Sequence, residues 1–294
     1  MTVVHLRRAP DVLLVDGEHL AYRAFYVFST LCTSAGDPSG VFYGILSMLR
    51  TQLERRAPGR IVLVWGSPGN GSNRKALYSE YKGTRSKRPD FQAQVLSVQR
   101  FLSYLNWDQY YTDSGWEADD VIATLARFYA QKGQHVAILS GDHDFLQLVN
   151  ANVTCVVPGK SRVDTQFTPE KIWEVYGVEP QRLVDVFALC GETADNITGV
   201  PRVGETTAQQ LVAKFGAVDT WLEKVREMDE ITPTLRQSLW DNRDLVRRNK
   251  ELIDLSLRDV ELCAIVCGEN TMAATGVLAE YEIKKFGVYD FTGK

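Results

Sequence analysis

The chain has 294 residues, about twice the roughly 150 residues typical of one domain. Apolar residues make up 45% and charged residues 24%, which excludes a disordered or fibrous chain. The net charge of −4 gives no overall basic balance of the kind that indicates nucleic-acid binding. No apolar run approaches the roughly 18 residues of a membrane span, no signal-peptide pattern opens the chain, and five scattered cysteines do not suggest disulfides. We therefore expect a globular, cytoplasmic protein without a membrane partner.

The first half of the sequence alternates short apolar runs with helical patterns. Residues 12–16, 61–65 and 136–140 are continuous apolar runs and predict buried strands, and helical patterns occupy residues 39–56 and 116–129. Buried strands that alternate with helices are typical of a mostly parallel sheet with helices on both faces. The sequence therefore predicts an α/β fold for this part.

The pattern changes after about residue 168. Five segments, each bounded by turn or capping residues, predict helices at residues 167–178, 181–190, 206–216, 219–225 and 244–255. The sheet-based first part therefore leads into a helical second part.

Eight carboxylates lie at the ends of the predicted elements, in four clusters. They are Asp16 after the first strand, Glu117, Asp119 and Asp120 at the start of a helix, Asp142 and Asp144 after the third strong strand, and Glu192 and Asp195 at the start of the helical part. Each cluster alone has a structural explanation, because acidic residues commonly cap helices and form turns. Ligands of parallel sheets, however, bind outside the carboxyl ends of the strands, where several of these acids lie.

A gathering of these acids would require cations. Two carboxylates about 4 Å apart repel by roughly 1 kcal/mol in water and by about 4 kcal/mol at an effective dielectric constant near 20. All-oxygen ligands favour Mg²⁺ or Mn²⁺ over zinc. The four histidines are isolated, and Cys263 and Cys267 lack a second ligand pair, so no zinc site competes.

A basic stretch interrupts the acidic chain between residues 74 and 88. Six cations face the single acid Glu80, and Tyr78 and Tyr81 lie among them. The cations are Arg74, Lys75, Lys82, Arg85, Lys87 and Arg88. Cations for phosphates and aromatic rings for unstacked bases are what a single-strand binding groove requires. The alternative is a solvated basic face.

Residues 199–204, with the sequence GVPRVG, predict a tight glycine-bounded hairpin. Thr206 or Thr207 is expected to cap the helix that follows. Backbone N–H groups at such a hairpin and helix N-terminus suit a phosphodiester, so the spacing resembles a helix–hairpin–helix element that binds duplex DNA. The alternative is a plain helix–turn–helix corner. The residues expected at the duplex are Gly199, Val200, Arg202, Gly204 and Thr206.

Six segments occur together in one order: LLVDGEHLAYRAF, SGVFYGILSML, ALYSEYKGTR, GWEADDVIATLA, SGDHDFLQLV and FALCGETADNITGVPRVGETTA. They cover residues 11–216, and NKELIDLSLRDVEL matches a later segment. In these motifs the chain resembles the 5′-nuclease, or flap endonuclease, superfamily, which includes the 5′-nuclease domain of bacterial DNA polymerase I and stand-alone bacterial and phage relatives. The resemblance implies a PIN-like nuclease core at residues 1–185 with a helical arch near 74–92. It also implies a helical DNA-binding part at 186–294 with its hairpin motif near 191–216.

The same resemblance implies a metal-dependent phosphodiesterase with two or more Mg²⁺ or Mn²⁺ ions. By carry-over, Asp16, Glu117, Asp119 and Asp120 would form the first metal site, and Asp142, Asp144, Glu192 and Asp195 the second. Arg23, Lys82 and Arg85 would neutralise the scissile phosphate or guide the 5′ strand through the arch. The hairpin would hold duplex DNA, with a K⁺ ion coordinated by its backbone carbonyls.

Two positions depart from the family pattern. The family carries a metal-site Asp after the second strand, whereas this chain has Gly66 or Ser67 there and no acid between residues 61 and 79. Glu192 stands where the family usually has Asp. Loss of the Asp would leave an extra water on the metal or impair turnover, and Glu18 is a hypothetical replacement.

The sequence therefore predicts a stand-alone structure-specific 5′ nuclease, bacterial or phage-encoded. Its substrate would be DNA with a 5′ flap, a 5′ overhang or a single-strand/duplex junction, and a separate DNA polymerase and ligase are plausible partners. One alternative is a DNA-junction binding protein of the same fold with weak or no catalysis because of the missing Asp. The other is a related metal nuclease acting on RNA, against which the DNA-type hairpin counts.

Overall fold

The computed structural model describes residues 9–66, 71–83, 89–111, 115–159, 163–256, 260–265 and 267–292. Its contacts divide the chain into two compact units. Unit 1 comprises residues 1–70, 87–141 and 260–294, and unit 2 comprises residues 71–86 and 142–259. These units interleave along the chain, whereas the sequence predicts two consecutive parts that meet at residue 185, and that boundary stays a prediction. Within the described ranges, no helix has the length and apolar character needed to cross a membrane.

Unit 1 is built on a sheet with the strand order β4-β1-β2-β3-β9. Its strands are β1 (Val12–Asp16), β2 (Arg60–Val64), β3 (Asp108–Tyr111), β4 (Val136–Leu139) and β9 (Cys263–Ala264). The first four run parallel and β9 pairs antiparallel with β3 at the edge. The predicted strands at 12–16, 61–65 and 136–140 are thus confirmed to within one residue. The more polar β3 and the two-residue β9 carry no such apolar signal.

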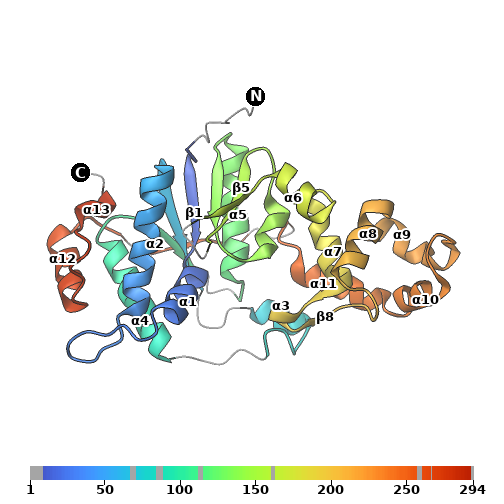
Figure 1. The fold of residues 1–294 in the computed structure, drawn as a ribbon, viewed down its shortest axis with the longest axis horizontal. Helices are drawn as coiled ribbons and strands as arrows, with labels where there is room; N and C mark the ends of the chain where they lie inside the picture. Colours follow the sequence, from blue (N-terminus) through green and yellow to red (C-terminus); the bar gives the residue numbers. More distant parts are fainter. Residues whose placement is uncertain are drawn as a thin grey trace. The chain divides into compact units, whose positions relative to one another are not determined.

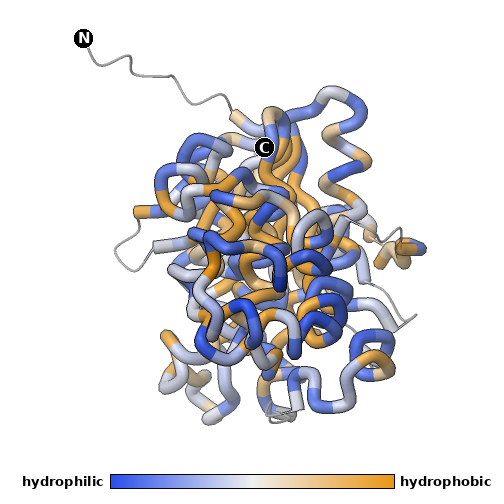
Figure 2. The backbone as a smooth tube through the Cα atoms, turned by 90° about the vertical axis from the view of Figure 1, so that its right-hand side faces the viewer, coloured by the Kyte–Doolittle hydropathy of each residue, from blue (hydrophilic) through white to orange (hydrophobic). Residues whose placement is uncertain are grey.

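Helices cover both faces of this sheet, as predicted. The helices of unit 1 are α1 (Gly17–Val27), α2 (Gly40–Arg56), α4 (Pro89–Ser103), α5 (Ala118–Gln131), α12 (Thr271–Glu280) and α13 (Tyr289–Thr292). In Figure 1, α2 and α4 lie on one side of β1 and α5 lies on the other. Orange hydrophobic and blue hydrophilic residues alternate along the helical turns in Figure 2, which is typical of helices with one buried face.

Unit 2 is mainly helical, as the sequence predicts after residue 168. Its helices are α3 (Ser72–Leu77), α6 (Pro169–Tyr176), α7 (Leu183–Cys190), α8 (Glu205–Phe215), α9 (Val218–Trp221), α10 (Pro233–Asp241) and α11 (Arg243–Ile253). Its 3-10 helices are η1 (His143–Leu148), η2 (Pro180–Arg182), η3 (Thr193–Asp195) and η4 (Leu222–Glu227). Its strands form two antiparallel pairs: β5 (Val153–Val157) with β6 (Thr165–Phe167), and β7 (Gly191–Glu192) with β8 (Ile197–Thr198).

Helix α11 packs against α7, and α7 packs against α8. The apolar residues Val246, Leu252 and Ile253 recur along α11 at helical spacing, and all three are buried. The fully buried Asn249 lies on the same face. A polar side chain in such a position requires hydrogen-bond partners, and Asn249 finds them at the candidate site described below.

Candidate functional site

Three of the eight predicted metal-site carboxylates meet in unit 2. Ligand atoms of Asp142, Asp144 and Glu192 all lie within 4.8 Å of one another. Asp142 caps the short helix η1, and its Oδ1 accepts a hydrogen bond of 2.9 Å from the backbone N–H of Asp144. This tight turn aligns the first two acids, and β7 supplies Glu192. We call these three residues the carboxylate cluster.

The carboxylate cluster offers only oxygen ligands. The neighbouring thiols stay protonated near neutral pH, because burial, followed by the negative charge of Glu205, raises the pKa of Cys190 to about 11. Burial and the charge of Asp142 likewise raise the pKa of Cys155. Carboxylate oxygens without thiolate or imidazole suit a hard divalent cation, so the residues present fit Mg²⁺ or Mn²⁺.

Asp195, the fourth acid predicted for this metal site, bonds to the basic stretch, and its role as a metal ligand stays a prediction. Its Oδ2 accepts a 2.9 Å hydrogen bond from the Tyr81 hydroxyl and lies 3.3 Å from Lys82 Nζ. The backbone N–H of Lys82 also donates to the Asp195 carbonyl at 3.0 Å. Asp195 and the Lys82 side chain are both largely buried, so this contact fixes residues 81–83 to the turn after Glu192.

Part of the basic stretch serves packing rather than single-strand binding, which corrects the expectation for two residues. Arg74 is 2% exposed, and its Nε donates to the Leu252 carbonyl at 2.9 Å. Tyr81 is also 2% exposed and lies in a hydrophobic cluster with Ile197 and Leu252. Neither side chain is presented to a phosphate or a base. Tyr78 was also expected among the DNA-facing rings. The guanidinium carbon of Arg248 lies over its ring, 4.2 Å from the ring centroid.

Lys75 is exposed and stays a predicted DNA contact. Arg85, Lys87 and Arg88, also predicted to contact DNA, lie outside the described residues. The roles of these four cations remain predictions from the sequence.

The first predicted metal site lies in unit 1, where its acids take part in local hydrogen bonds. Asp16 accepts from the His19 N–H at 2.9 Å and from Ser140 Oγ at 2.7 Å. Asp120 accepts from the backbone N–H of Glu117 at 2.8 Å and so caps α5, which is the structural alternative considered for this cluster. Within the described ranges, the carboxylate cluster of unit 2 is the group of acids whose ligand atoms gather within 4.8 Å. A metal site formed by the unit 1 acids, including the half-buried Asp119, stays a prediction.

A tryptophan fills the space at the end of β2, beside the position of the missing acid. Trp65 is 1% exposed, and its Nε1 donates to Gln109 Oε1 at 3.0 Å. The ring lies so close to Gly17, the residue after Asp16, that a Cβ there would be 2.6 Å from it. Gly66 follows half-buried, and Ser67 lies outside the described residues. On α1 the structure places Arg23, half-buried, and Glu18, without testing their predicted roles.

The predicted glycine-bounded hairpin is present. It is a tight turn in which the Val203 N–H donates to the Val200 carbonyl at 3.0 Å. It directly follows the short antiparallel pair β7–β8, in which Gly191 pairs with Thr198. Only glycine fits at position 199, because the backbone of Cys190 approaches it closely and a Cβ there would lie 2.1 Å from the Cys190 carbonyl oxygen. We call residues 199–204 the hairpin turn.

The start of α8 differs from expectation. Helix α8 begins at Glu205 with Gly204 as its N-cap, so Thr206 and Thr207 lie in its first turn and do not cap it. Arg202 has the positive φ of 70°, whereas Gly204 has φ −83°. Val200 is 3% exposed, so its side chain packs in the interior. Arg202, Gly204 and Thr206 are exposed and remain candidate DNA contacts.

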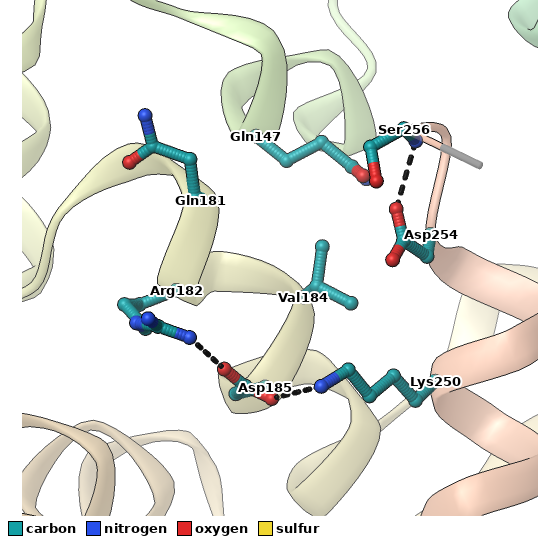
Figure 3. Close-up of a pocket in the computed structure, with 8 residues that line it drawn as sticks. All are labelled: Gln147, Gln181, Arg182, Val184, Asp185, Lys250, Asp254 and Ser256. Atoms are coloured by element: carbon teal, nitrogen blue, oxygen red, sulfur yellow. Dashed lines mark hydrogen bonds and ion pairs between the residues drawn. The ribbon is translucent and has the colours of Figure 1, made fainter. Parts of the chain in front are cut away.

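Sequence reasoning missed a polar pocket in unit 2 of about 190 Å³ (Figure 3). The buried Asp185 lies between Arg182 Nη1 at 3.2 Å and Lys250 Nζ at 3.0 Å. Burial acts to lower the pKa of Lys250, but the carboxylates of Asp219 and Asp185 outweigh it and raise that pKa. Both cations are therefore paired with carboxylates of the same unit.

Gln147 lines the same pocket and ties η1 to the end of α11. Its Nε2 donates to the Ile253 carbonyl at 3.1 Å, and its Oε1 accepts from the Leu255 N–H at 2.9 Å. Gln147 is buried and stands three residues after Asp144 in the same short helix. It therefore fixes the turn that aligns Asp142 and Asp144. A glutamine three residues after an acidic turn forms no recognisable motif, so the sequence did not predict this role for Gln147.

Comparisons with known proteins agree with this arrangement. The family model described as "5′-3′ exonuclease, N-terminal resolvase-like domain" matches residues 11–177, and "5′-3′ exonuclease, C-terminal SAM fold" matches residues 178–266. A 5′-3′ exonuclease of Aquifex aeolicus is 35% identical over 250 residues, which cover 85% of this chain and 80% of that protein. The thermostable DNA polymerase I of Thermus filiformis is 40% identical over 230 residues, 78% of this chain but 26% of the polymerase. The chain thus spans about a quarter of the length of its polymerase relatives.

Solved structures share the fold. The flap endonuclease of bacteriophage T5, in a pseudo-enzyme-product complex with DNA and metal ions, superposes with a TM-score of 0.68 at 18% identity and covers 96% of both chains. Together the two family models extend from the first strand of unit 1 to beyond α11, and so include both the carboxylate cluster and the hairpin turn. The chain therefore belongs to the 5′-3′ exonuclease family.

Proposed function

We propose that the protein is a structure-specific 5′ nuclease that hydrolyses DNA phosphodiesters at 5′ ends and flap junctions with Mg²⁺ or Mn²⁺. The observation that carries the proposal is the carboxylate cluster. It forms in the same unit as the hairpin turn, in which Gly199 allows close approach of the backbone. Oxygen ligands for a hard cation beside a backbone turn suited to phosphate are the two parts a metal-dependent phosphodiesterase requires.

In this proposal Asp142, Asp144 and Glu192 hold a divalent ion. When bound, such an ion lowers the pKa of water and stabilises the charged oxygens of an in-line displacement. Lys82, beside Asp195, would neutralise the scissile phosphate. The first metal site, formed by Asp16, Glu117, Asp119 and Asp120 and assisted by Arg23, is part of the same proposal.

The hairpin turn would anchor the duplex part of the substrate. Its exposed Arg202 would pair with a phosphate, and the turn carbonyls would coordinate K⁺. The phage flap endonuclease whose fold it shares was crystallised with DNA, which supports a DNA substrate with a 5′ flap, overhang or junction. Cytoplasmic action beside a DNA polymerase and a ligase would follow from such a substrate.

Replacement of a cluster acid tests the proposal. Asp144→Ala should abolish cleavage of a 5′-flap duplex in Mg²⁺ or Mn²⁺ and leave DNA affinity equal or higher, since it removes negative charge that faces the phosphates. Asp241→Ala, at an exposed acid outside the cluster, is the matched control. Cleavage by the Asp144 variant at the wild-type rate would exclude the cluster as the metal site.

A DNA-junction binding protein without turnover is the second candidate function. Gly66 favours it, because it stands at the end of β2, beside the buried indole of Trp65, at one of the two positions where the family carries an acid. High flap affinity in Ca²⁺ without cleavage in Mg²⁺ or Mn²⁺ would support this candidate. The same flap made of RNA tests the third reading, an RNA nuclease.

A further inference from the structure

A buried asparagine ties together the two ends of the segment that carries Glu192. Asn249 on α11 is 0% exposed, and its Nδ2 donates to the Ala188 carbonyl at 3.0 Å and to the Thr198 carbonyl at 2.8 Å. An amide nitrogen has two hydrogens, so both are used. Arg248 Nη2 donates to Asn249 Oδ1 at 3.0 Å, which fixes the orientation of the amide.

These bonds complete the C-terminal end of α7. The last carbonyls of a helix lack partners within the helix and must find them elsewhere. The Phe187 carbonyl accepts from the Gly191 N–H, and the Leu189 carbonyl accepts from the Val200 N–H at 2.8 Å. The Ala188 carbonyl between them accepts from Asn249. The Gly191 N–H belongs to β7 and the Val200 N–H to the hairpin turn, whereas Asn249 lies on a different helix, α11.

Helix α11 is also bonded to the turn that carries the other two acids. Gln147, three residues after Asp144, accepts from the Leu255 N–H and donates to the Ile253 carbonyl at the end of α11. One helix is therefore bonded both to η1, which carries Asp144, through Gln147, and to the residue before the hairpin turn, through Asn249.

We propose that Asn249 is a positioning residue that keeps the hairpin turn in register with the carboxylate cluster. The inference rests on the proposed function, in which the hairpin turn anchors the duplex and the cluster holds the metal at the scissile phosphate. The distance between anchor and cluster then sets which phosphodiester is cut. Asn249 donates to Thr198, the residue directly before the hairpin turn, so loss of the amide loosens that distance. The ligands stay in place, because the Gly191 N–H beside Glu192 still donates to the Phe187 carbonyl and Gln147 still holds η1.

Cleavage-site mapping tests the proposal. Asn249→Ser shortens the donor, and Asn249→Asp keeps the shape but replaces the donor by an oxygen that repels the two carbonyls. Val246→Ala, one turn earlier on the same buried face, is the control for destabilised packing of α11. Each variant is given a 5′-flap duplex in Mg²⁺ or Mn²⁺, and its products are mapped at single-nucleotide resolution alongside kcat, KM and the Kd for Mn²⁺ without DNA.

We expect Asn249→Ser to spread cleavage over neighbouring phosphodiesters and to lower kcat by about 10- to 100-fold, the scale of a misplacement near 1 Å. Its Kd for Mn²⁺ should stay close to that of the wild type. Val246→Ala should keep the wild-type cleavage position. A single wild-type cleavage position in both Asn249 variants, or equal spreading in Val246→Ala, would overturn the proposal.

A second readout is independent of catalysis. If the wild-type protein cuts no flap, the proposed function fails, and amide hydrogen exchange in the DNA-free protein decides the role of Asn249. Faster exchange at Val200 and Val203 in Asn249→Ser than in Val246→Ala would support the link between α11 and the hairpin turn. Equal exchange in the two variants would overturn it.

Discussion

Charge repulsion within the carboxylate cluster predicts opposite effects of one substitution with and without metal. Glu192→Gln preserves the size of the side chain and removes one of three negative charges whose ligand atoms lie within 4.8 Å. One pair of charges at that distance repels by about 0.9 kcal/mol in water and by about 3.5 kcal/mol at an effective dielectric constant near 20. Asp142 and Glu192 are half-buried, so solvent screening places each pair nearer the lower figure.

The substitution removes two of the three pairs. In EDTA we therefore expect Glu192→Gln to be more stable than the wild type by about 2 kcal/mol, which corresponds to roughly 4–8 °C in the unfolding midpoint for a chain of this size. Saturating Mn²⁺ should reverse the order. An ion at 100 times its Kd stabilises the folded state by about 2.7 kcal/mol, and the variant, with one anionic ligand fewer, binds it more weakly.

Thermal unfolding in EDTA and in a Mn²⁺ titration measures both effects. Glu179→Gln, at an exposed glutamate outside the cluster, should leave both midpoints unchanged. If Glu192→Gln is no more stable than the wild type in EDTA, the three charges do not repel as their distances require. If Mn²⁺ stabilises both proteins equally, Glu192 is not a ligand.

Four further predictions concern the DNA contacts, the start of α8 and the missing acid. Lys82→Ala should lower kcat on a flap by about 10- to 100-fold, through loss of a charge-assisted bond of roughly 1.5–3 kcal/mol, with little change in duplex affinity by anisotropy. Arg202→Ala should reduce the salt dependence of duplex binding by about one unit of slope. Gly204→Val meets no described atom within 4 Å of its Cβ, but it replaces the glycine N-cap of α8 by a poor cap residue, so it should lower the unfolding free energy by about 1 kcal/mol. Gly66→Asp should lower the Mg²⁺ concentration needed for half-maximal cleavage, and Mn²⁺ should activate the wild type better than Mg²⁺. Identical metal dependence of the wild type and Gly66→Asp would show that the missing acid is not limiting.

The fold could be predicted wherever apolar residues form a clear pattern, either a continuous run or a helical repeat. Residues 12–15 are continuously apolar because β1 is buried on both faces between β2 and β4, and this run gave the strand almost to the residue. The edge strands gave no such signal. β9 consists of Cys263 and Ala264 alone, and β3 contains Asp108, so their pairing depends on tertiary neighbours that a local pattern does not report.

The acids of the candidate site could be predicted by type and position, but their partners could not. Asp142, Asp144 and Glu192 were recognisable because acids at element ends recur in the family motifs, and the structure gathers them. Asp195 has the same sequence signal, yet Tyr81 and Lys82, more than a hundred residues earlier, bond to it. Sequence spacing carries no information about which of several acids a distant cation will contact.

The basic stretch shows that the contacts of cations are equally hard to predict from sequence. Arg74 and Lys75 are adjacent and chemically alike, yet Arg74 is buried on the Leu252 carbonyl while Lys75 is exposed. A buried guanidinium must satisfy its donors within the protein, and one whose donors are so satisfied is not offered to a phosphate. The sequence therefore gives the largest number of cations that can contact DNA. The burial of each side chain in the fold decides which of them are accessible to it. By that criterion Lys75 and Arg202, which are exposed, are the predicted DNA contacts to test first within the described part of unit 2, and the buried Arg74 and Tyr81 pack around Lys82 and Asp195.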